Sequence, residues 1–229
     1  MKLCLITYDV PHLKTAQVAI GLKNRGFDRI DFLLMPFRSR TKRHVLFEHR
    51  PAQTVGPEPR SLAGYTSGQI YPYDFWSKLV AEYDFFIVCG SNIIGEEFAR
   101  CGKILNVHAG LIPAVRGLDS FKWAILKRLP LGNTLHRIDA QVDAGEVLAL
   151  CPTPVFAEDD LQTLARRHYE NEIWMLTNID NLLVKPHPTS LLPVGEPTMR
   201  MSSENEARMM SGFEDYKKEF SVASVSLTI

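Results

Sequence analysis

Apolar and polar positions along the chain form blocks that predict strands and helices in turn. Residues 2–8 are a short apolar run, which is typical of a buried strand. Over Leu13–Arg25 apolar residues recur at helical spacing, and Gly26 ends this predicted helix. A second strand is predicted over Ile30–Phe37. The chain therefore opens with a strand–helix–strand unit, which is the building block of a parallel sheet.

The alternation resumes after a long irregular stretch. Residues 38–70 are rich in Arg, Pro, Gly and Ser without periodicity, so we expect a loop with at most one short helix. Asp74 is predicted to cap a helix that runs to about Glu82. The later predicted elements are a strand Phe85–Cys89, a helix Glu96–Arg100, a strand Ile104–Val107, a helix Asp119–Leu129, strands Asn133–Ile138 and Glu146–Val155, a long amphipathic helix Asp159–Leu183 and a polar helix Glu204–Phe220.

This order of elements predicts an α/β fold. We expect a doubly wound, mostly parallel, Rossmann-like sheet with a helical C-terminal extension. A chain of 229 residues is long enough for one sizeable domain. We expect residues 1–184 to form that domain, and residues 185–229 to be an extension that is not an independent domain.

Composition and charge narrow the classes of protein to which the chain can belong. Hydrophobic residues make up 45% and charged residues 23%, as in ordinary soluble proteins. Lys plus Arg equals Asp plus Glu at 26 each, so no global field favours nucleic acid. No segment has the length of a membrane span or the pattern of a signal peptide. The cysteines and histidines lack metal-ligand or redox spacing, so we expect a cytoplasmic protein without a metal site.

Three polar side chains lie at the ends of predicted strands. Asn106 and His108 close one strand, and Asp143 follows another in a turn that ends at Gly145. An open parallel sheet binds ligands beyond the carboxyl ends of its strands, so these groups can meet in one crevice. An amide, an imidazole and a carboxylate are the polar groups needed for acyl transfer to an amine. A lone histidine at a strand end is more often structural, and only its partners give His108 a chemical role.

The sequence around these residues is similar to the catalytic block of the folate-dependent formyltransferase family. The matching motifs follow one another in the order found in that family. They are Asn106-x-His108, Ile112-Pro113-x-x-Arg116-Gly117, Trp123-Ala124, Gly132-x-Thr134-x-His136 and Val142-Asp143-x-Gly145. The family usually has Ser where Gly110 stands and Leu where Ile112 stands. Neither difference removes a catalytic group, although Gly110 removes one hydroxyl from the loop.

The resemblance implies transfer of a formyl group from 10-formyltetrahydrofolate to an amine. His108 and Asn106 would stabilise the negative oxygen of the tetrahedral intermediate. Asp143 would orient His108 and help to move the proton that the amine loses. The folate-binding residues implied in the same way are Gly90, Ser91, Asn92, Ile93, Ile94 and Asp139.

Within this family, the chain looks most like the sugar N-formyltransferases. Members that act on initiator tRNA carry an additional C-terminal barrel, whereas the sequence after residue 158 here is helical and charge-balanced. Purine-pathway members usually have a glycine-rich loop after the first strand, where this chain has Tyr8-Asp9-Val10-Pro11-His12. The subgroup implies a nucleotide-linked amino-dideoxysugar as acceptor, a role in surface polysaccharide (O-antigen) biosynthesis, and a homodimer. A purine-type amine acceptor, a formyltetrahydrofolate hydrolase and a non-catalytic binding module are the alternatives.

Acceptor binding is expected where the first strand ends and after the second strand. The expected substrate-binding residues are Asp9, His12, Arg38, Arg40 and Lys42. Arg and Lys side chains there would match the oxygens of a nucleotide diphosphate. The alternative is that this basic stretch is a solvated loop.

Overall fold

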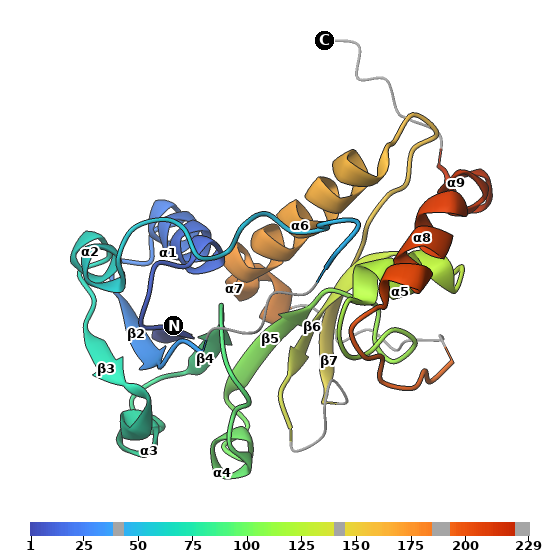
Figure 1. Ribbon diagram of the computed structural model, residues 1–229. Helices are drawn as coiled ribbons and strands as arrows, with labels where there is room; N and C mark the ends of the chain where they lie inside the picture. Colours follow the sequence, from blue (N-terminus) through green and yellow to red (C-terminus); the bar gives the residue numbers. More distant parts are fainter. Residues whose placement is uncertain (39–43, 140–144, 185–192, 223–229) are drawn as a thin grey trace.

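A seven-stranded sheet forms the centre of the fold in the computed structural model, which describes residues 1–38, 44–139, 145–184 and 193–222 (Figure 1). The strand order is β3-β2-β1-β4-β5-β6-β7. The strands are β1 Leu3–Tyr8, β2 Ile30–Met35, β3 Ile70–Pro72, β4 Phe85–Val88, β5 Ile104–His108, β6 Gly132–Arg137 and β7 Val147–Pro152. The five neighbouring strands β3, β2, β1, β4 and β5 pair in parallel. Strand β6 pairs antiparallel with both β5 and β7. The predicted mostly parallel sheet is confirmed.

Helices cover both faces of the sheet, as predicted for a doubly wound fold. They are α1 Leu13–Asn24, α2 Pro59–Tyr65, the 3-10 turn η1 Tyr73–Phe75, α3 Trp76–Leu79, α4 Glu96–Ala99, α5 Ser120–Leu126, α6 Leu161–Thr177, α7 Ile179–Leu183, α8 Ser203–Ser211 and α9 Phe213–Phe220. The long helix predicted over 159–183 is two helices, because Asn178 ends α6 and begins α7. The polar helix predicted over 204–220 is divided in the same way at Gly212, a poor helix former.

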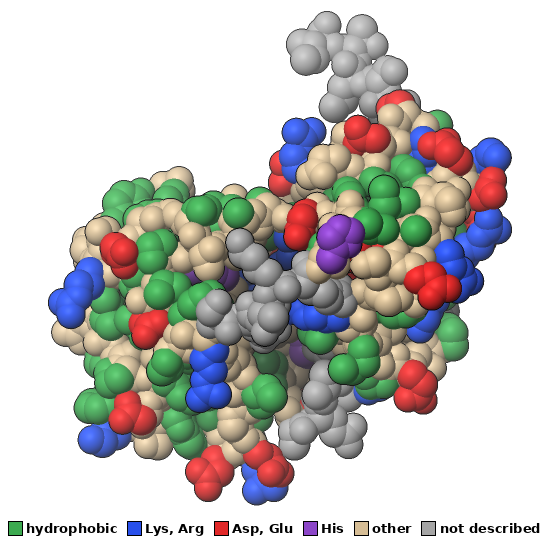
Figure 2. All heavy atoms as spheres, in the orientation of Figure 1, with side chains coloured by type: hydrophobic (Ala, Val, Ile, Leu, Met, Phe, Trp, Pro, Cys, Tyr) green, Lys and Arg blue, Asp and Glu red, His purple; other side chains and the backbone are tan. Residues whose placement is uncertain are grey.

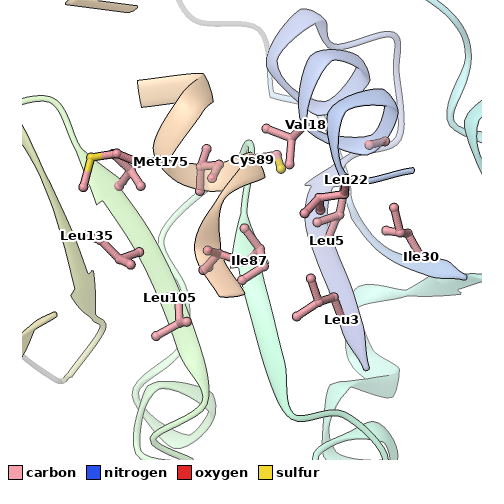
Figure 3. Packing of buried hydrophobic residues seen from close by; sticks show 14 of the residues in the cluster. Leu3, Leu5, Val18, Leu22, Ile30, Ile87, Cys89, Leu105, Leu135 and Met175 are labelled. Carbon is pink, nitrogen blue, oxygen red and sulfur yellow. The ribbon is translucent and has the colours of Figure 1, made fainter. Parts of the chain in front are cut away.

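Successive side chains of the central strands point into two different cores. Leu3 and Leu5 of β1 belong to a core that α1, α2, α6 and α7 cover, whereas Ile6 belongs to a core that also contains residues of α3 and α4. In Figure 3, Val18 of α1 and Met175 of α6 lie over the strands of the first core. The period-two alternation of a strand thus explains why both faces of β1 are apolar.

Two local predictions between residues 70 and 82 are wrong. The short edge strand β3 was not predicted, because three residues are too few to show an alternating pattern. Asp74 does not cap a helix; it lies inside η1, and the following helix α3 already ends at Leu79.

The C-terminal helices pack against α5 and form a third core at one end of the sheet (Figure 1). Residues that build this contact are Phe121 and Ile125 of α5 with Met209, Phe213 and Tyr216 of α8 and α9. Within it, Nζ of Lys122 and Oε1 of Glu206 form an ion pair of 2.6 Å, and both side chains are fully buried. The contact between the extension and the sheet domain therefore combines an apolar core with a buried pair of charges.

Candidate active site

Asn106 and His108 lie at the end of β5 and point to the same side of the sheet, because side chains alternate along a strand. Their cross-strand neighbours on β6 are His136 and Thr134. The amide of Asn106 donates from Nδ2 to Nε2 of His136 over 3.1 Å. An amide carries two N–H groups, so one can hold the side chain in place while the other contacts a ligand.

His108 is buried, and a neighbouring loop sets the orientation of its ring. Its Nε2 lies 3.0 Å from the carbonyl oxygen of Val115 and 3.1 Å from Oγ of Ser120. The carbonyl can only accept, and the Ser120 hydroxyl donates to the carbonyl of Gly117 over 2.9 Å. Nε2 therefore carries a proton, and the charge of the ring depends on Nδ1. Sequence reasoning missed Ser120, because its contact with His108 is not local in sequence.

Gly110 allows the loop to approach the ring of His108 closely. Oγ1 of Thr134 donates to the carbonyl of Gly110 over 2.7 Å and so ties the loop to β6. A Cβ atom at position 110 would lie 2.7 Å from the carbonyl oxygen of Val115 and 3.0 Å from Nε2 of His108. The serine that the family resemblance would place at this position therefore does not fit without a shift of the loop. The hydroxyl beside the ring comes from Ser120 instead.

Gly110→Ala is expected to destabilise the protein by about 1–3 kcal/mol, because the added methyl group overpacks a site bounded by backbone. Gly64→Ala is the matched control: it lies in α2 and an added Cβ would meet nothing within 4 Å. That change is expected to be neutral or to stabilise by up to about 1 kcal/mol. Urea unfolding of both variants measures the difference, and equal midpoints would contradict this account of the loop.

Asp143 lies outside the described residues, in the connection between β6 and β7. The described residues on either side of that connection define where it starts and ends. Because β6 runs antiparallel to β5, the end of β6 at Arg137 lies beside Leu105 near the start of β5, not beside His108. A Cβ atom on Gly145 would lie 1.7 Å from the carbonyl oxygen of Arg137, so only glycine fits there. Asn106 and His108 lie together at the end of β5, and the position of Asp143 stays a prediction.

The predicted folate-binding residues 90–94 follow β4. Gly90 is buried, and a Cβ there would lie 2.8 Å from ring atoms of both His12 and Tyr8. The carbonyl of Ser91 accepts a hydrogen bond of 2.6 Å from the hydroxyl of Tyr8. Gly90 and Ser91 line a pocket that is described next.

The other predicted folate-binding residues lie farther along this loop and after β6. The amide of Asn92 donates to the carbonyl of Pro36 over 2.9 Å. Ile93 is 95% exposed, whereas Ile94 is partly buried against the core that contains α4 residues. Asp139, at the end of β6, is exposed.

A pocket with two adjoining lobes is lined by Asn106 and His108 on one side and by Gly90 on the other. The first, which we call the Asn-His lobe, has a volume of about 460 Å³ and includes Asn106, His108, His49, Asp119, Ser120 and Glu172 in its wall. The second, the cationic lobe, has a volume of about 470 Å³ and includes Tyr8, His12, Arg38, Gln53 and Gly90. The residues shared by both walls are Lys14, Arg50, Ser91 and Arg200.

The expected substrate-binding residues do not all line the same pocket. His12 and Arg38 line the cationic lobe. Asp9 lines a different pocket of about 500 Å³, and its carboxylate accepts a hydrogen bond from the amide of Phe37. Arg40 and Lys42 lie outside the described residues.

Two charged residues of the pocket were not identified from sequence, although each carries a signal. Lys14 and Glu172 are buried members of α1 and α6, and Nζ of Lys14 lies 2.6 Å from Oε1 of Glu172. Charged side chains are almost never fully buried unless they are paired. The sequence signal was a lysine and a glutamate on the apolar faces of two predicted helices. Such charges are expected to pair with each other and to mark a functional site.

On the face drawn in Figure 2, positively and negatively charged side chains are interspersed, in keeping with 26 of each sign in the chain. The described part of the chain contains no helix that is long and apolar enough to cross a bilayer. Within those same residues, no three His, Cys, Asp or Glu side chains gather as a metal site requires. Any selectivity for a charged ligand therefore depends on local groups.

Folding stability is expected to fall as the pH drops from about 6.5 towards 4, because the buried histidines His12, His49 and His168 stay neutral in the folded state. Burial, with Lys14 and Arg50 nearby, lowers the pKa of His12 from 6.5 to about 4. Burial likewise lowers the pKa of His168 to about 4. In this window the unfolded chain binds more protons than the folded one, at about 1.4 kcal/mol per pH unit for each proton.

Urea unfolding between pH 7.5 and 4.5 measures this loss. The His168→Gln variant is the control. Its unfolding free energy should change less steeply with pH, by the contribution of one proton. Although burial alone raises it, Arg50 and Lys14 lower the pKa of the Glu172 carboxyl from 4.5 to about 2, so the stability that this group contributes is present near neutral pH and is lost mainly below pH 4.5. Constant stability over the whole range would contradict the neutral state of these rings.

The chain matches a known protein family over more than half of its length. A family profile described as "Formyl transferase" matches residues 52–179 of the 229. The phosphoribosylglycinamide formyltransferase of Haemophilus influenzae is 31% identical over 93 residues, which are 39% of this chain and 44% of that protein. The chain spans less than half the length of the curated relatives it matches.

Solved structures share the fold at low sequence identity. A sugar N-formyltransferase from Shewanella sp. is 17% identical with a TM-score of 0.59, and the match covers 92% of this chain and 87% of that one. An N-formyltransferase from Helicobacter canadensis, in complex with folinic acid and dTDP-3-aminofucose, is 15% identical with a TM-score of 0.60, covering 93% of this chain and 80% of that one. These likenesses support the Rossmann-like architecture.

Proposed function

The chain belongs to the formyl transferase family, and from that membership we propose that it transfers a formyl group from 10-formyltetrahydrofolate to the amine of a nucleotide-linked amino-dideoxysugar. The observation that carries the proposal is the pair Asn106 and His108 in one pocket wall. His136, Val115 and Ser120 hold this pair in place through the hydrogen bonds described above. Preorganised donors of this kind favour a reaction in which negative charge develops on an oxygen.

The reaction exchanges one carbon–nitrogen bond for another. The bond from the formyl carbon to the folate nitrogen breaks, and a bond from that carbon to the acceptor amine forms. The amine loses a proton and the folate nitrogen gains one. We assign Asn106 and His108 to the formyl oxygen, where each donor contributes roughly 3–4 kcal/mol in comparable enzymes. Asp143, which lies outside the described residues, is assigned to orient His108 and to help move the proton.

The Asn-His lobe fits a folate headgroup in size and in polarity. Its volume of about 460 Å³ falls in the range of roughly 300–1,000 Å³ that is usual for small-molecule sites. The amide of Asn106 and the backbone of Ser91 offer hydrogen-bonding groups for a heterocycle. The folinic acid bound by the Helicobacter canadensis protein, which shares this fold, supports a reduced folate as the donor.

Two observations bear on the acceptor. The structural relatives include a protein bound to dTDP-3-aminofucose, which supports a nucleotide-linked aminosugar. The curated relatives include phosphoribosylglycinamide formyltransferases, so phosphoribosylglycinamide is the second candidate. The expected role in O-antigen assembly, the cytoplasmic location and the homodimer belong to the first candidate, and light scattering of the purified protein tests the dimer.

A panel assay separates these functions. The purified protein is mixed with 10-formyltetrahydrofolate and, in parallel, with nucleotide-linked 3-amino and 4-amino dideoxysugars, with phosphoribosylglycinamide, or with no acceptor. Tetrahydrofolate release and the mass of the product are followed. We expect a formylated aminosugar and slow release without acceptor. Formylation of phosphoribosylglycinamide alone would replace the sugar by the purine precursor, and equal release without acceptor would indicate a hydrolase.

A further inference from the structure

The two lobes of the pocket differ in the charge of their walls. Among the described residues, the cationic lobe is lined by Lys14, Arg38, Arg50 and Arg200 and by no carboxylate. The wall of the Asn-His lobe shares three of these cations but also contains the carboxylates of Glu48, Asp119 and Glu172. A local excess of one charge attracts a ligand group of the opposite charge. An anionic group is therefore favoured in the cationic lobe, whereas the three cations and three carboxylates of the Asn-His lobe balance.

Two of the cations are fixed by one buried carboxylate. Nζ of Lys14 lies 2.6 Å from Oε1 of Glu172, and Nη2 of Arg50 lies 2.5 Å from Oε2 of the same side chain. Although burial alone raises it, Arg50 and Lys14 lower the pKa of Glu172 to about 2, so this carboxylate is charged at neutral pH. Two positive charges share one negative charge, which leaves this group with a net charge of plus one.

Arg200 reaches the pocket from the C-terminal extension. Segment 195–201 runs beside the loop 113–119, and backbone hydrogen bonds join the two. These bonds are Gly195 N to Pro113 O at 2.8 Å, Thr198 N to Arg116 O at 2.9 Å and Leu118 N to Thr198 O at 2.8 Å. In addition, the amide of Met201 donates to the carboxylate of Asp119 over 2.9 Å. Asp119, at the start of the predicted helix Asp119–Leu129, therefore binds this segment, and its side chain makes no capping bond to α5.

Two glycines make this close approach possible. A Cβ atom on Gly117, whose φ is +88°, would lie 2.3 Å from the carbonyl oxygen of Thr198. A Cβ atom on Gly195 would lie 2.0 Å from the carbonyl oxygen of Ala114. Because both obstacles are backbone atoms, the position of segment 195–201 is set by direct main-chain contact. This main-chain contact therefore also places Arg200 in the wall shared by the two lobes.

The guanidinium of Arg200 is available to a ligand. Its nearest ion-pair partner is Asp119, whose Oδ1 lies 3.8 Å from Nη1, and 47% of the Arg200 side chain is exposed. A separation of 3.8 Å is longer than a hydrogen bond, and an exposed ion pair of this kind is weak. Guanidinium groups carry five N–H donors in a planar fork that matches the oxygens of a phosphate.

We propose that Arg200 binds the diphosphate of the acceptor together with Arg50 and Lys14 in the cationic lobe. Segment 195–201 of the C-terminal extension is thus part of the acceptor site, and Arg200 selects acceptors that carry a diphosphate. This inference rests on the proposed function for the identity of the acceptor. Because the two lobes adjoin, a diphosphate held in the cationic lobe leaves the amine of the same molecule near His108.

The test compares Arg200→Gln with the matched control Arg208→Gln. Arg208 lies on α8 of the same extension, hydrogen-bonds locally to Asn205 and lines neither lobe. For Arg200→Gln we expect the KM of the nucleotide-linked aminosugar to rise about tenfold or more, with kcat changed by less than about threefold, because a charge-assisted contact to the bound ground state is lost. The KM of the folate should not change. Arg208→Gln should behave as the wild type.

A second measurement does not depend on turnover. Calorimetric titration with inorganic pyrophosphate should show binding to the wild type and to Arg208→Gln, and about tenfold weaker binding to Arg200→Gln. Unchanged pyrophosphate affinity in Arg200→Gln would overturn the inference. So would an equal loss of activity on an aminosugar without the nucleotide. If the wild type binds pyrophosphate through Arg200 but transfers no formyl group, the anion site stands and the proposed function fails.

Discussion

His108→Ala is expected to reduce formyl transfer by roughly 10²–10⁴-fold, because the variant loses both a donor to the developing oxyanion and a group that moves protons. The ring is buried in the pocket wall, and its Nε2 is held by Val115 and Ser120. Single-turnover rates with saturating folate and acceptor measure the effect on the chemical step.

Two variants control for structure in this experiment. His44→Ala removes an exposed imidazole that lines neither lobe, and it should keep full activity. Ser120→Ala keeps the ring of His108 but removes the acceptor at 3.1 Å, so it should cost only about tenfold or less. Thermal unfolding shows whether His108→Ala is folded. A folded His108→Ala protein with the activity of the wild type would refute the assigned role.

Glu206→Ala is expected to destabilise the protein by about 3–5 kcal/mol, because it leaves the charge of Lys122 buried without its partner. The two groups lie 2.6 Å apart with both side chains fully buried. Glu206 also accepts a hydrogen bond of 2.6 Å from the amide of Leu46, so its loss leaves that donor without this acceptor. Chemical denaturation gives the free energy of unfolding.

The exposed pair Glu96–Arg100 on α4 provides the comparison. Both of its side chains are largely exposed, so Glu96→Ala should cost at most about 1 kcal/mol. The double variant Lys122→Met with Glu206→Leu should recover most of the stability that Glu206→Ala loses, because it replaces the pair by apolar groups. If Glu206→Ala loses no more stability than Glu96→Ala, the buried ion pair does not contribute strongly to the packing of α5 against α8.

The same denaturation curves bear on the expectation that residues 185–229 are not an independent domain. Helices α8 and α9 share their apolar core with α5. If the extension unfolds with the sheet domain, wild type and variant should each show one cooperative transition. A separate early transition in which only the extension is lost would mean that the extension folds on its own.

Much of the fold could be predicted because its elements are long enough to show their period. The strand β1 and the helix α1 agree with prediction within one or two residues. The edge strand β3 has three residues, and the breaks at Asn178 and Gly212 interrupt continuous apolar periodicity by single residues. Such features depend on edge pairing and on local backbone bonds, which a hydrophobic pattern does not record.

For the candidate site, the chemical groups can be identified from sequence, since Asn106 and His108 belong to a recognisable motif at a strand end. What surrounds them is visible only in the folded chain. The structure shows that β6 is antiparallel to β5, that Glu172 joins Lys14 to Arg50, and that Arg200 reaches the same pocket. A local pattern indicates the burial of one element. The contact between Lys14 and Glu172, which are 158 positions apart, depends instead on how two separate helices pack, and that packing leaves no periodic pattern in the chain.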